Sequence, residues 1–248
     1  VQVIHVHVDP ATRISPEISV TVTCHAGHTY YYSYTLHSLP SSQQKLAAVW
    51  LRTSADPIAE SAPPGWGGGV SFLPSGGTEI RWIVDSEEAM ILPGNSLGGY
   101  MVASQGPPGI VTAAFQGWVP AFRRPSSDPN IVYITDRRPW EEDHVPVRTV
   151  GPVPPEGVPT HPIARLDRLL LLTQEAINLG WLTGPGKSIR AKLQRAREDL
   201  AGASPDKARK NLSSLLNELE AQRGKHVSQE AYFLLRLNVE QILDGLGN

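Results

Sequence analysis

Several features that would narrow the function of this 248-residue chain are missing from its sequence. The single cysteine, Cys24, cannot form a disulfide within the chain, so cysteine usage gives no evidence about the redox compartment. No apolar run approaches the roughly 18 residues that a membrane-spanning helix requires. The 22 basic and 24 acidic residues nearly cancel, so the net charge gives no reason to expect nucleic acid or an anionic membrane as a partner.

Recognised catalytic motifs are also missing. The chain has no Gly-x-Ser-x-Gly nucleophile elbow, and Cys24 lacks a signature that would link it to a catalytic histidine. The segment 184–188 contains the Gly-Lys-Ser with which a phosphate-binding loop motif ends, but Trp181 stands where that motif needs its first glycine. Three carboxylates, Asp85, Glu87 and Glu88, invite comparison with a glycosidase pair, although acidic residues are common in turns. We therefore expect no catalysis and no cofactor.

The first half of the chain has the pattern of an antiparallel β-sandwich. Short alternating or β-branched runs are separated by glycine and proline turns, which favours strands and excludes long helices. The domain is expected to span residues 1–124. The expected strands are 1–8, 18–24, 29–36, 47–53, 79–84, 99–104 and 110–119.

Residues 125–161 are rich in proline and predict an extended arm. The apolar run 131–134 could pair as a strand, and Trp140 is too apolar to be left in water. Parts of the arm are therefore expected to dock, either on the chain's own β-domain or on a neighbouring subunit.

From residue 162 the apolar periodicity becomes helical and predicts an antiparallel four-helix bundle over residues 162–248. Pro162 and Pro205 suit first-turn positions, Gly224 is a stop signal, and Ser228 is the expected N-cap of the last helix. The predicted fold class is thus multidomain β plus α.

The helical part resembles the FIMAH-type domain found at the end of many bacterial extracellular and surface proteins. The resemblance rests on residues 188–196, on residues 208–219 and on residues 224–228, and it covers about the last 85 residues. At one point the sequence departs from the pattern, having Leu215-Leu216 where an aromatic and an aliphatic residue are usual. The resemblance implies a fold and a cell-surface setting but assigns no binding residues.

The β-domain is more faintly similar to domains of bacterial secreted proteins of unassigned function, which implies export but no activity. The similarity lies in residues 30–36, 63–66, 81–82 and 93–100. The chain also begins at Val1 rather than methionine, which we interpret as removal of a secretory signal or an expression tag. An extracellular or cell-surface location is therefore expected.

Two histidines, His5 and His7, alternate on the first expected strand and point to one face. Together with His25, His28 or His37 they could gather a metal ion if the strands lie side by side. No spacing matches a known zinc motif, so we expect no metal site.

Tyrosines at positions 30, 31, 32 and 34 give an aromatic strand. Alternation places Tyr30, Tyr32 and Tyr34 on one side and Tyr31 on the other. Packing in the core and under the arm is the favoured interpretation, and stacking on sugars is the alternative. The same two interpretations apply to Trp66.

The leading hypothesis is a non-catalytic extracellular structural or interaction protein that self-assembles. The apolar terminal strand containing Val1, Val3 and Ile4 could add to another subunit's sheet, with Trp140 as an anchor in the arm. The alternative is a carbohydrate-binding or adhesion module, and a metal-dependent enzyme comes third. The partners expected are other copies, cell-surface components or a glycan, and not nucleic acid.

Overall fold

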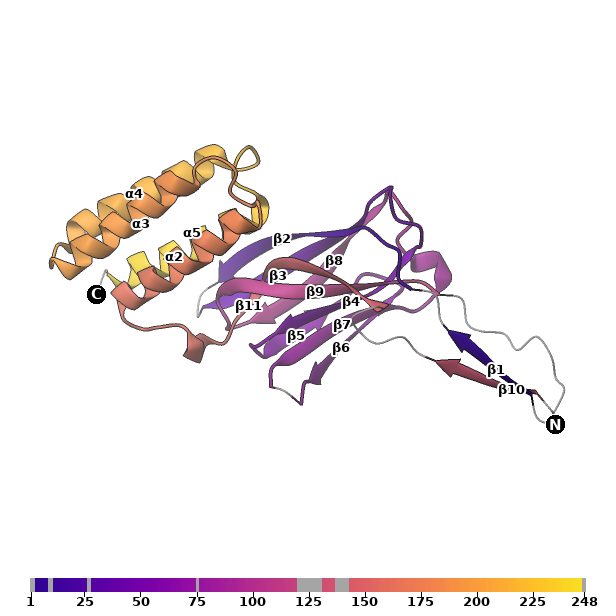
Figure 1. The fold of residues 1–248 in the computed structure, drawn as a ribbon. Coiled ribbons are helices and arrows are strands. Elements are labelled where there is room, and N and C mark those ends of the chain that lie inside the picture. The colour runs from indigo at the N-terminus through magenta and orange to yellow at the C-terminus, as the bar shows by residue number, and fades with distance from the viewer. Residues whose placement is uncertain are drawn as a thin grey trace.

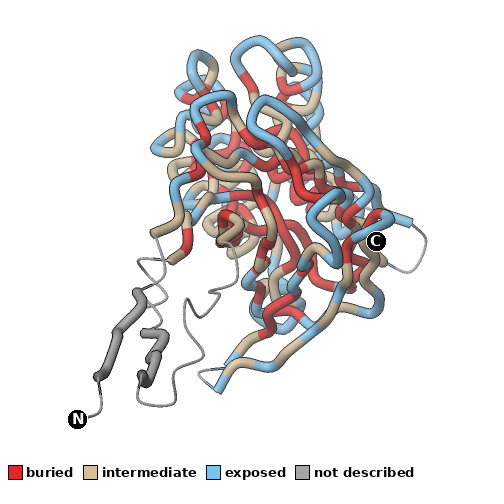
Figure 2. The backbone as a smooth tube through the Cα atoms, turned by 90° about the vertical axis from the view of Figure 1, so that its right-hand side faces the viewer, coloured by how far each residue is buried: buried red, intermediate tan, exposed pale blue. Residues whose placement is uncertain are grey.

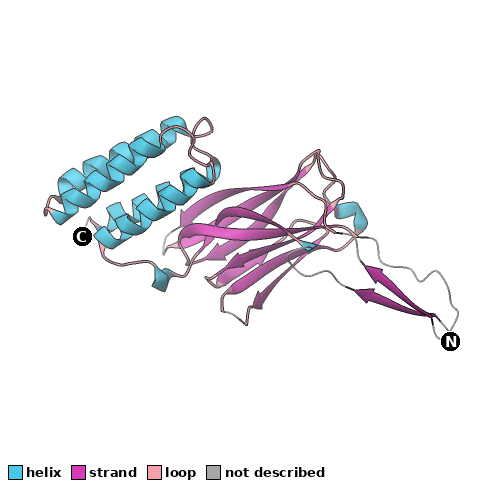
Figure 3. Cartoon of the chain, in the orientation of Figure 1, coloured by secondary structure: helices cyan, strands magenta, loops and turns pink. Residues whose placement is uncertain are grey.

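The structure is a computed structural model that describes residues 3–8, 11–25, 28–74, 76–119, 131–136 and 143–246, with the ranges 3–8 and 131–136 described by their backbone alone. Two antiparallel sheets form most of its β structure, and four helices gather at one end (Figure 1, Figure 3). The five-stranded sheet has the order β11-β9-β4-β7-β6, and the four-stranded sheet has the order β2-β3-β8-β5.

All seven expected strands are present, the run 131–134 pairs as part of β10 as expected, and β5, β6 and β11 are additional. The strand bounds are β1 Val3–Val8, β2 Pro16–His25, β3 Thr29–Ser38, β4 Leu46–Thr53, β5 Pro57–Ser61, β6 Trp66–Phe72, β7 Thr78–Val84, β8 Ser96–Ser104, β9 Pro108–Gly117, β10 Ile131–Asp136 and β11 Val145–Pro152. Short 3-10 turns occur at η1 (Glu87–Ala89) and η2 (Pro155–Gly157).

The two sheets pack face to face around an aromatic core. Trp82 on β7 lies 6.0 Å from Tyr34 on β3 and 5.5 Å from Tyr100 on β8, measured between ring centroids. Trp66 on β6 meets Tyr100 edge to face at 5.3 Å. Each contact joins one sheet to the other, so these rings hold the sandwich together. Buried residues run through the interior of the molecule, and exposed residues concentrate in its outer loops (Figure 2).

Strand β6, which was not among the expected strands, contains three consecutive glycines. Charged side chains lie close to the place that a Cβ would take at each glycine: Asp85 at Gly67, Glu60 of β5 at Gly68 and Arg81 of β7 at Gly69. Glycine therefore serves here to let side chains lie across an edge strand.

Part of the predicted proline-rich arm belongs to the sandwich. Residues 145–152 form β11, which pairs antiparallel with β9 along its whole length. Pro146 and Pro152 fit because β11 is an edge strand, where a missing N–H need not break the ladder. This stretch of the arm thus docks on the chain's own β-domain, one of the two surfaces expected for it, and does so as a strand of the sheet.

Strands β1 and β10 form a separate two-stranded parallel sheet, in register from Val3 opposite Ile131 to Val8 opposite Asp136. It lies beyond the end of the sandwich that is opposite the helices (Figure 1).

The C-terminal region forms the four expected helices, α2 Pro162–Asn178, α3 Gly186–Ala201, α4 Pro205–Gln222 and α5 Gln229–Gly245. Proline stands in the first turn of α2 and α4, and the Ser228 hydroxyl caps α5 by accepting from the Ala231 N–H at 3.2 Å. Gly224, in the turn after α4, has a φ of 71°, which glycine adopts without strain. No helix in the described residues is long and apolar enough to cross a membrane.

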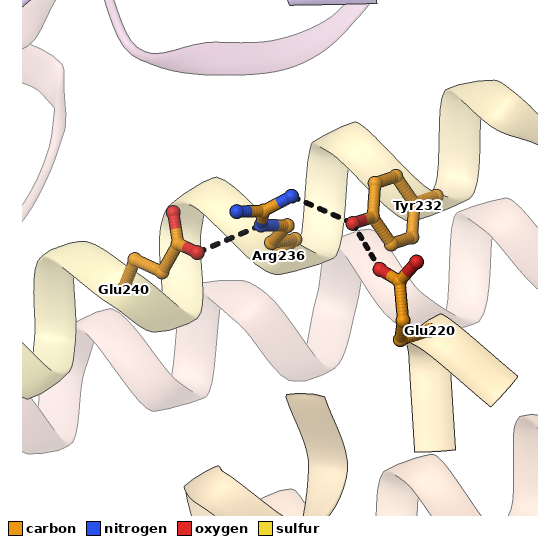
Figure 4. A network of polar contacts seen from close by, with 4 residues as sticks. All are labelled: Glu220, Tyr232, Arg236 and Glu240. Carbon is orange, nitrogen blue, oxygen red and sulfur yellow. Dashed lines mark hydrogen bonds and ion pairs between the residues drawn. The ribbon is translucent and has the colours of Figure 1, made fainter. Parts of the chain in front are cut away.

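A polar network joins α4 to α5 (Figure 4). The hydroxyl of Tyr232 donates to Glu220 at 2.5 Å and accepts from Arg236 at 2.7 Å, and Arg236 pairs with Glu240 at 2.7 Å. The Arg223 guanidinium stacks 4.3 Å from the centre of the Tyr232 ring. Burial, together with the hydrogen bond to Glu220, raises the pKa of Tyr232. The network ties the end of α4 to the helix that contacts the sandwich.

Candidate functional site

The tyrosines proposed as a sugar-stacking face lie inside the sandwich. The side chains of Tyr30, Tyr32 and Tyr34 are all buried, while Tyr31 is partly exposed on the opposite face of β3. The alternation was therefore predicted correctly. The inward face of β3 packs against the second sheet, because the aromatic rings are the largest apolar groups that this strand offers to the core.

The hydroxyl of each of these three buried tyrosines has a defined acceptor or donor. Tyr32 donates to the Gly106 carbonyl at 2.7 Å, and Tyr34 donates to the Val150 carbonyl of β11 at 3.1 Å. The Tyr30 hydroxyl accepts from the Gln241 side chain of α5. Desolvation raises the pKa of Tyr32 and Tyr34 well above its ordinary value, so both stay neutral.

Trp66 is also part of the core. Its side chain is 5% exposed, and its indole N–H donates to the Ala89 carbonyl at 2.9 Å. Burial leaves Tyr30, Tyr32, Tyr34 and Trp66 no open ring face on which a sugar could stack, so the sugar-stacking role proposed for these four residues lacks an exposed surface.

The histidines of the described side chains do not converge. Both ring nitrogens of His37 are occupied by serine hydroxyls, Nε2 by Ser19 at 3.0 Å and Nδ1 by Ser96 at 2.6 Å. His25 packs edge to face on Tyr31 at 5.0 Å. Within residues 11–25, 28–74, 76–119 and 143–246, no three histidine, cysteine or acidic side chains are placed to hold a metal ion together. The side chains of His5 and His7 lie outside the described set.

The acidic cluster after β7 borders an open pocket of about 440 Å³, lined also by Trp118 and Gln116. Glu87 is paired with Lys45 at 2.7 Å, and the same Lys45 ammonium lies 5.7 Å from the Trp118 ring centre. Hydrogen bonds to its own backbone and to Ser86 lower the pKa of Glu88. A glycosidase general acid needs a raised pKa, so Glu88 has the opposite property.

The residues proposed for assembly are only partly described. Val1 and Trp140 lie outside the described residues. Val3 and Ile4 are in β1 and pair with Ile131 and Val132 of the same chain. The terminal strand that was expected to add to another subunit therefore already has one partner strand within its own chain.

Helix α5 packs against the side of the sandwich where edge strands β2 and β11 lie. We call this side the covered side. The Gln229 side chain donates to the Val20 carbonyl of β2 at 2.9 Å and to the Thr21 hydroxyl at 2.8 Å. Asn238 donates to the Pro108 carbonyl at 3.0 Å, and Arg148 of β11 pairs with Glu175 of α2 at 2.5 Å. Polar side chains thus fasten the helices to the strands.

The opposite side, where edge strands β5 and β6 lie close together, is the open side. Val70 and Phe72 of β6 pair with the inward-facing Ile80 and Thr78, so they point toward the interior face of the sheet. They are nevertheless 41% and 75% exposed, and Ile58 of β5 is 60% exposed. The outer edges of β5 and β6 pair with no further strand in the part of the chain that the structure describes.

Comparisons with known proteins give no family. No protein-family model matches the sequence, and a search of curated proteins finds no match. Among solved structures, an uncharacterized protein from Nocardia farcinica with an immunoglobulin-like fold is similar, with 12% identity over 52% of this chain and 95% of that chain and a TM-score of 0.32. A cohesin module from a Clostridium perfringens family 33 glycoside hydrolase is similar, with 7% identity over 58% and 98% and a TM-score of 0.32. At these scores neither likeness bears on function.

Proposed function

We propose that this chain is a non-catalytic extracellular structural protein whose copies associate by adding strands to one another's sheets. The observation that carries the proposal is the separate β1–β10 sheet. Parallel pairs normally occur in larger sheets that are covered on both faces, and two strands alone are marginally stable in water. Pairing of β1 with the open sheet edge of another copy would join this small sheet to a larger one.

The open side supports the proposal as the place where a strand could be received. A sheet edge with unpaired backbone and exposed apolar side chains favours pairing with another chain. The β6 edge has both features, with Val70 and Phe72 beside an edge that has no strand partner among the described residues. At Gly67, Gly68 and Gly69 the β6 strand has no side chains of its own.

The extracellular setting belongs to the proposal as well. It rests on the resemblance of residues 163–248 to FIMAH-type domains, for which an antiparallel four-helix bundle is the expected packing. Labelling of intact source cells with an antibody against the chain tests it: surface labelling without permeabilisation is expected, and labelling only after permeabilisation would contradict it.

Light scattering after size-exclusion chromatography, together with electron microscopy, tests self-association. The whole chain is expected to form oligomers or filaments, and deletion of residues 1–8 is expected to reduce them to monomers, because the donated strand is lost. A monomer at high concentration without filaments would contradict the proposal.

A matched pair of variants tests the open side. Phe72→Lys places a charge beside the β6 edge and is expected to weaken association at least tenfold, since burying an unpaired charge is costly. Leu171→Lys is the control, because Leu171 is 73% exposed on α2, far along the chain from that edge. Equal association of the two variants would exclude β6 as the receiving strand.

A further inference from the structure

The charges of this nearly neutral chain are unevenly distributed. Residues 186–225, which include α3, α4 and the turn that follows, contain ten lysines and arginines against five acidic residues. Helices α2 and α5 together carry three basic and five acidic residues. The segment 186–225 is thus strongly basic, while the two helices beside it are slightly acidic. We call α3 and α4 with their connecting turn the basic hairpin.

The basic hairpin is the part of the helical region farthest from the sandwich. Helix α5 makes the contacts with the strands, α2 packs against α5, and α3 and α4 lie on the outer side of this pair (Figure 1). The apolar faces of both helices point inward, with Ile189, Leu193 and Ala196 of α3 and Leu212 and Leu215 of α4 buried. The positive side chains therefore face solvent.

Most of these cations have no acidic partner among the described residues. Two are in ion pairs, Lys192 with Glu218 and Arg197 with Asp167. The guanidinium of Arg190 meets only the neutral Gln174 side chain. No ion pair is present in the described residues for a further, exposed set: Lys187, Arg195, Lys207, Lys210 and Lys225. Exposed acidic residues also occur on these helices, Glu198 on α3 and Asp206 on α4, so the cations are in excess but are not alone.

The positive charges are spread along the hairpin. Lys187 and Arg195 are eight residues apart on α3, about 12 Å at 1.5 Å per residue. Lys207 and Lys210 lie on neighbouring turns of α4, and Lys225 follows that helix. A small anion would need charges that converge on one point. A row of charges instead fits an extended partner with repeated negative groups.

The side chains between the cations limit which classes of anionic partner this surface suits. Residues 186–225 contain no aromatic residue, so the stacking platforms on which single-stranded nucleic acid rests are missing. No large exposed apolar side chain of the described residues lies on α3 or α4, so the hairpin has nothing to insert into a bilayer. Lysine and arginine both bind phosphate oxygens, arginine in a bidentate manner.

We propose that the outer face of the basic hairpin binds a linear phosphate polymer that lacks aromatic bases. The contact is electrostatic and follows the length of α3 and α4. Binding releases counterions from the polymer, so the affinity falls as salt is added, with a slope set by the number of phosphates contacted. This proposal is independent of strand addition at the other end of the molecule.

Fluorescence anisotropy with labelled long-chain inorganic polyphosphate tests the proposal on the whole chain. The double variant Lys207→Gln/Lys210→Gln keeps good helix formers on α4. It is expected to weaken binding about tenfold at low salt and to reduce the slope of log affinity against log salt by about two, one for each lost phosphate contact.

The control is Arg13→Gln/Arg81→Gln, which removes the same net charge from exposed positions on the sandwich. It is expected to bind like the unchanged chain. Equal weakening in both double variants would show that net charge alone is responsible and would overturn the proposal. So would a lack of polyphosphate binding at low salt, or binding confined to phosphatidylglycerol vesicles.

Discussion

The covered side and the open side of the sandwich differ in what lies beside their edge strands, although each side has one edge strand from each of the two sheets. On the covered side, amide side chains from α5 meet strand backbone and side-chain groups, as Gln229 does at Val20 and Thr21. On the open side, Ile58, Val70 and Phe72 remain exposed and both edges end without a strand partner among the described residues. One side is thus completed within the chain, and the other has the features of an edge that a second chain could complete.

The largest expected effect is alkaline unfolding. The folded-state pKa values of Tyr32 and Tyr34 are raised well above the ordinary value near 10, so below about pH 10 both states hold these protons and stability is constant. Above it the unfolded state ionises first, and unfolding should become easier by about 1.4 kcal/mol per pH unit for each tyrosine.

Urea unfolding from about pH 8 to 11 measures this slope. Because Tyr34 bonds to β11, Tyr34→Phe should remove its share of the slope and so test the covered side directly. Stability that stays flat through this range would contradict the buried, neutral tyrosines.

Alanine in place of one glycine on each side should sharpen the comparison. A Cβ on Gly151 of β11 would meet the Val111 side chain at 2.7 Å and the Tyr34 hydroxyl at 3.2 Å. We expect Gly151→Ala to destabilise the fold by about 1–3 kcal/mol, as overpacking does.

On the open side, a Cβ on Gly69 of β6 would meet the flexible Arg81 side chain at 3.3 Å. Gly69→Ala should therefore change the free energy of unfolding by no more than about 0.5 kcal/mol. Chemical denaturation of the two variants compares them. A larger loss for Gly69→Ala would mean that the β6 edge is packed as tightly as β11.

The smallest difference should come from two tyrosine hydroxyls. Tyr34→Phe removes the donor to the Val150 carbonyl and should cost about 0.5–1.5 kcal/mol. The Tyr100 hydroxyl is buried and has no hydrogen-bond partner among the described residues. Tyr100→Phe should therefore be neutral or stabilising. Thermal unfolding monitored by near-UV circular dichroism ranks the two, and a costlier Tyr100→Phe would reverse the expectation.

Local patterns predicted most of the framework. The seven expected strands and four helices are present because their apolar residues recur with the period of the element that they form. Ser228 was identified as an N-cap because capping is a contact over three residues, Ser228 to Ala231.

What the sequence did not predict depends on distant residues. Strand β6 was not expected, since its three glycines offer no side-chain pattern, and the groups that lie beside them, Glu60, Arg81 and Asp85, come from other parts of the chain. The prolines of β11 suggested an arm, and only its edge position makes them acceptable. Alternation placed Tyr30, Tyr32 and Tyr34 together but could not tell which face of β3 the other sheet would cover.

The fastening of α5 to β2 has a consequence for synthesis. Gln229 and Val20 are separated by more than 200 positions, so the ribosome has to synthesise all of that intervening chain before the β2 edge receives its helix. Until then the nascent sandwich exposes both of its sides, and contacts of such long sequence separation form slowly. The interval between translation of the sheets and arrival of α5 is therefore when this protein has most need of a chaperone.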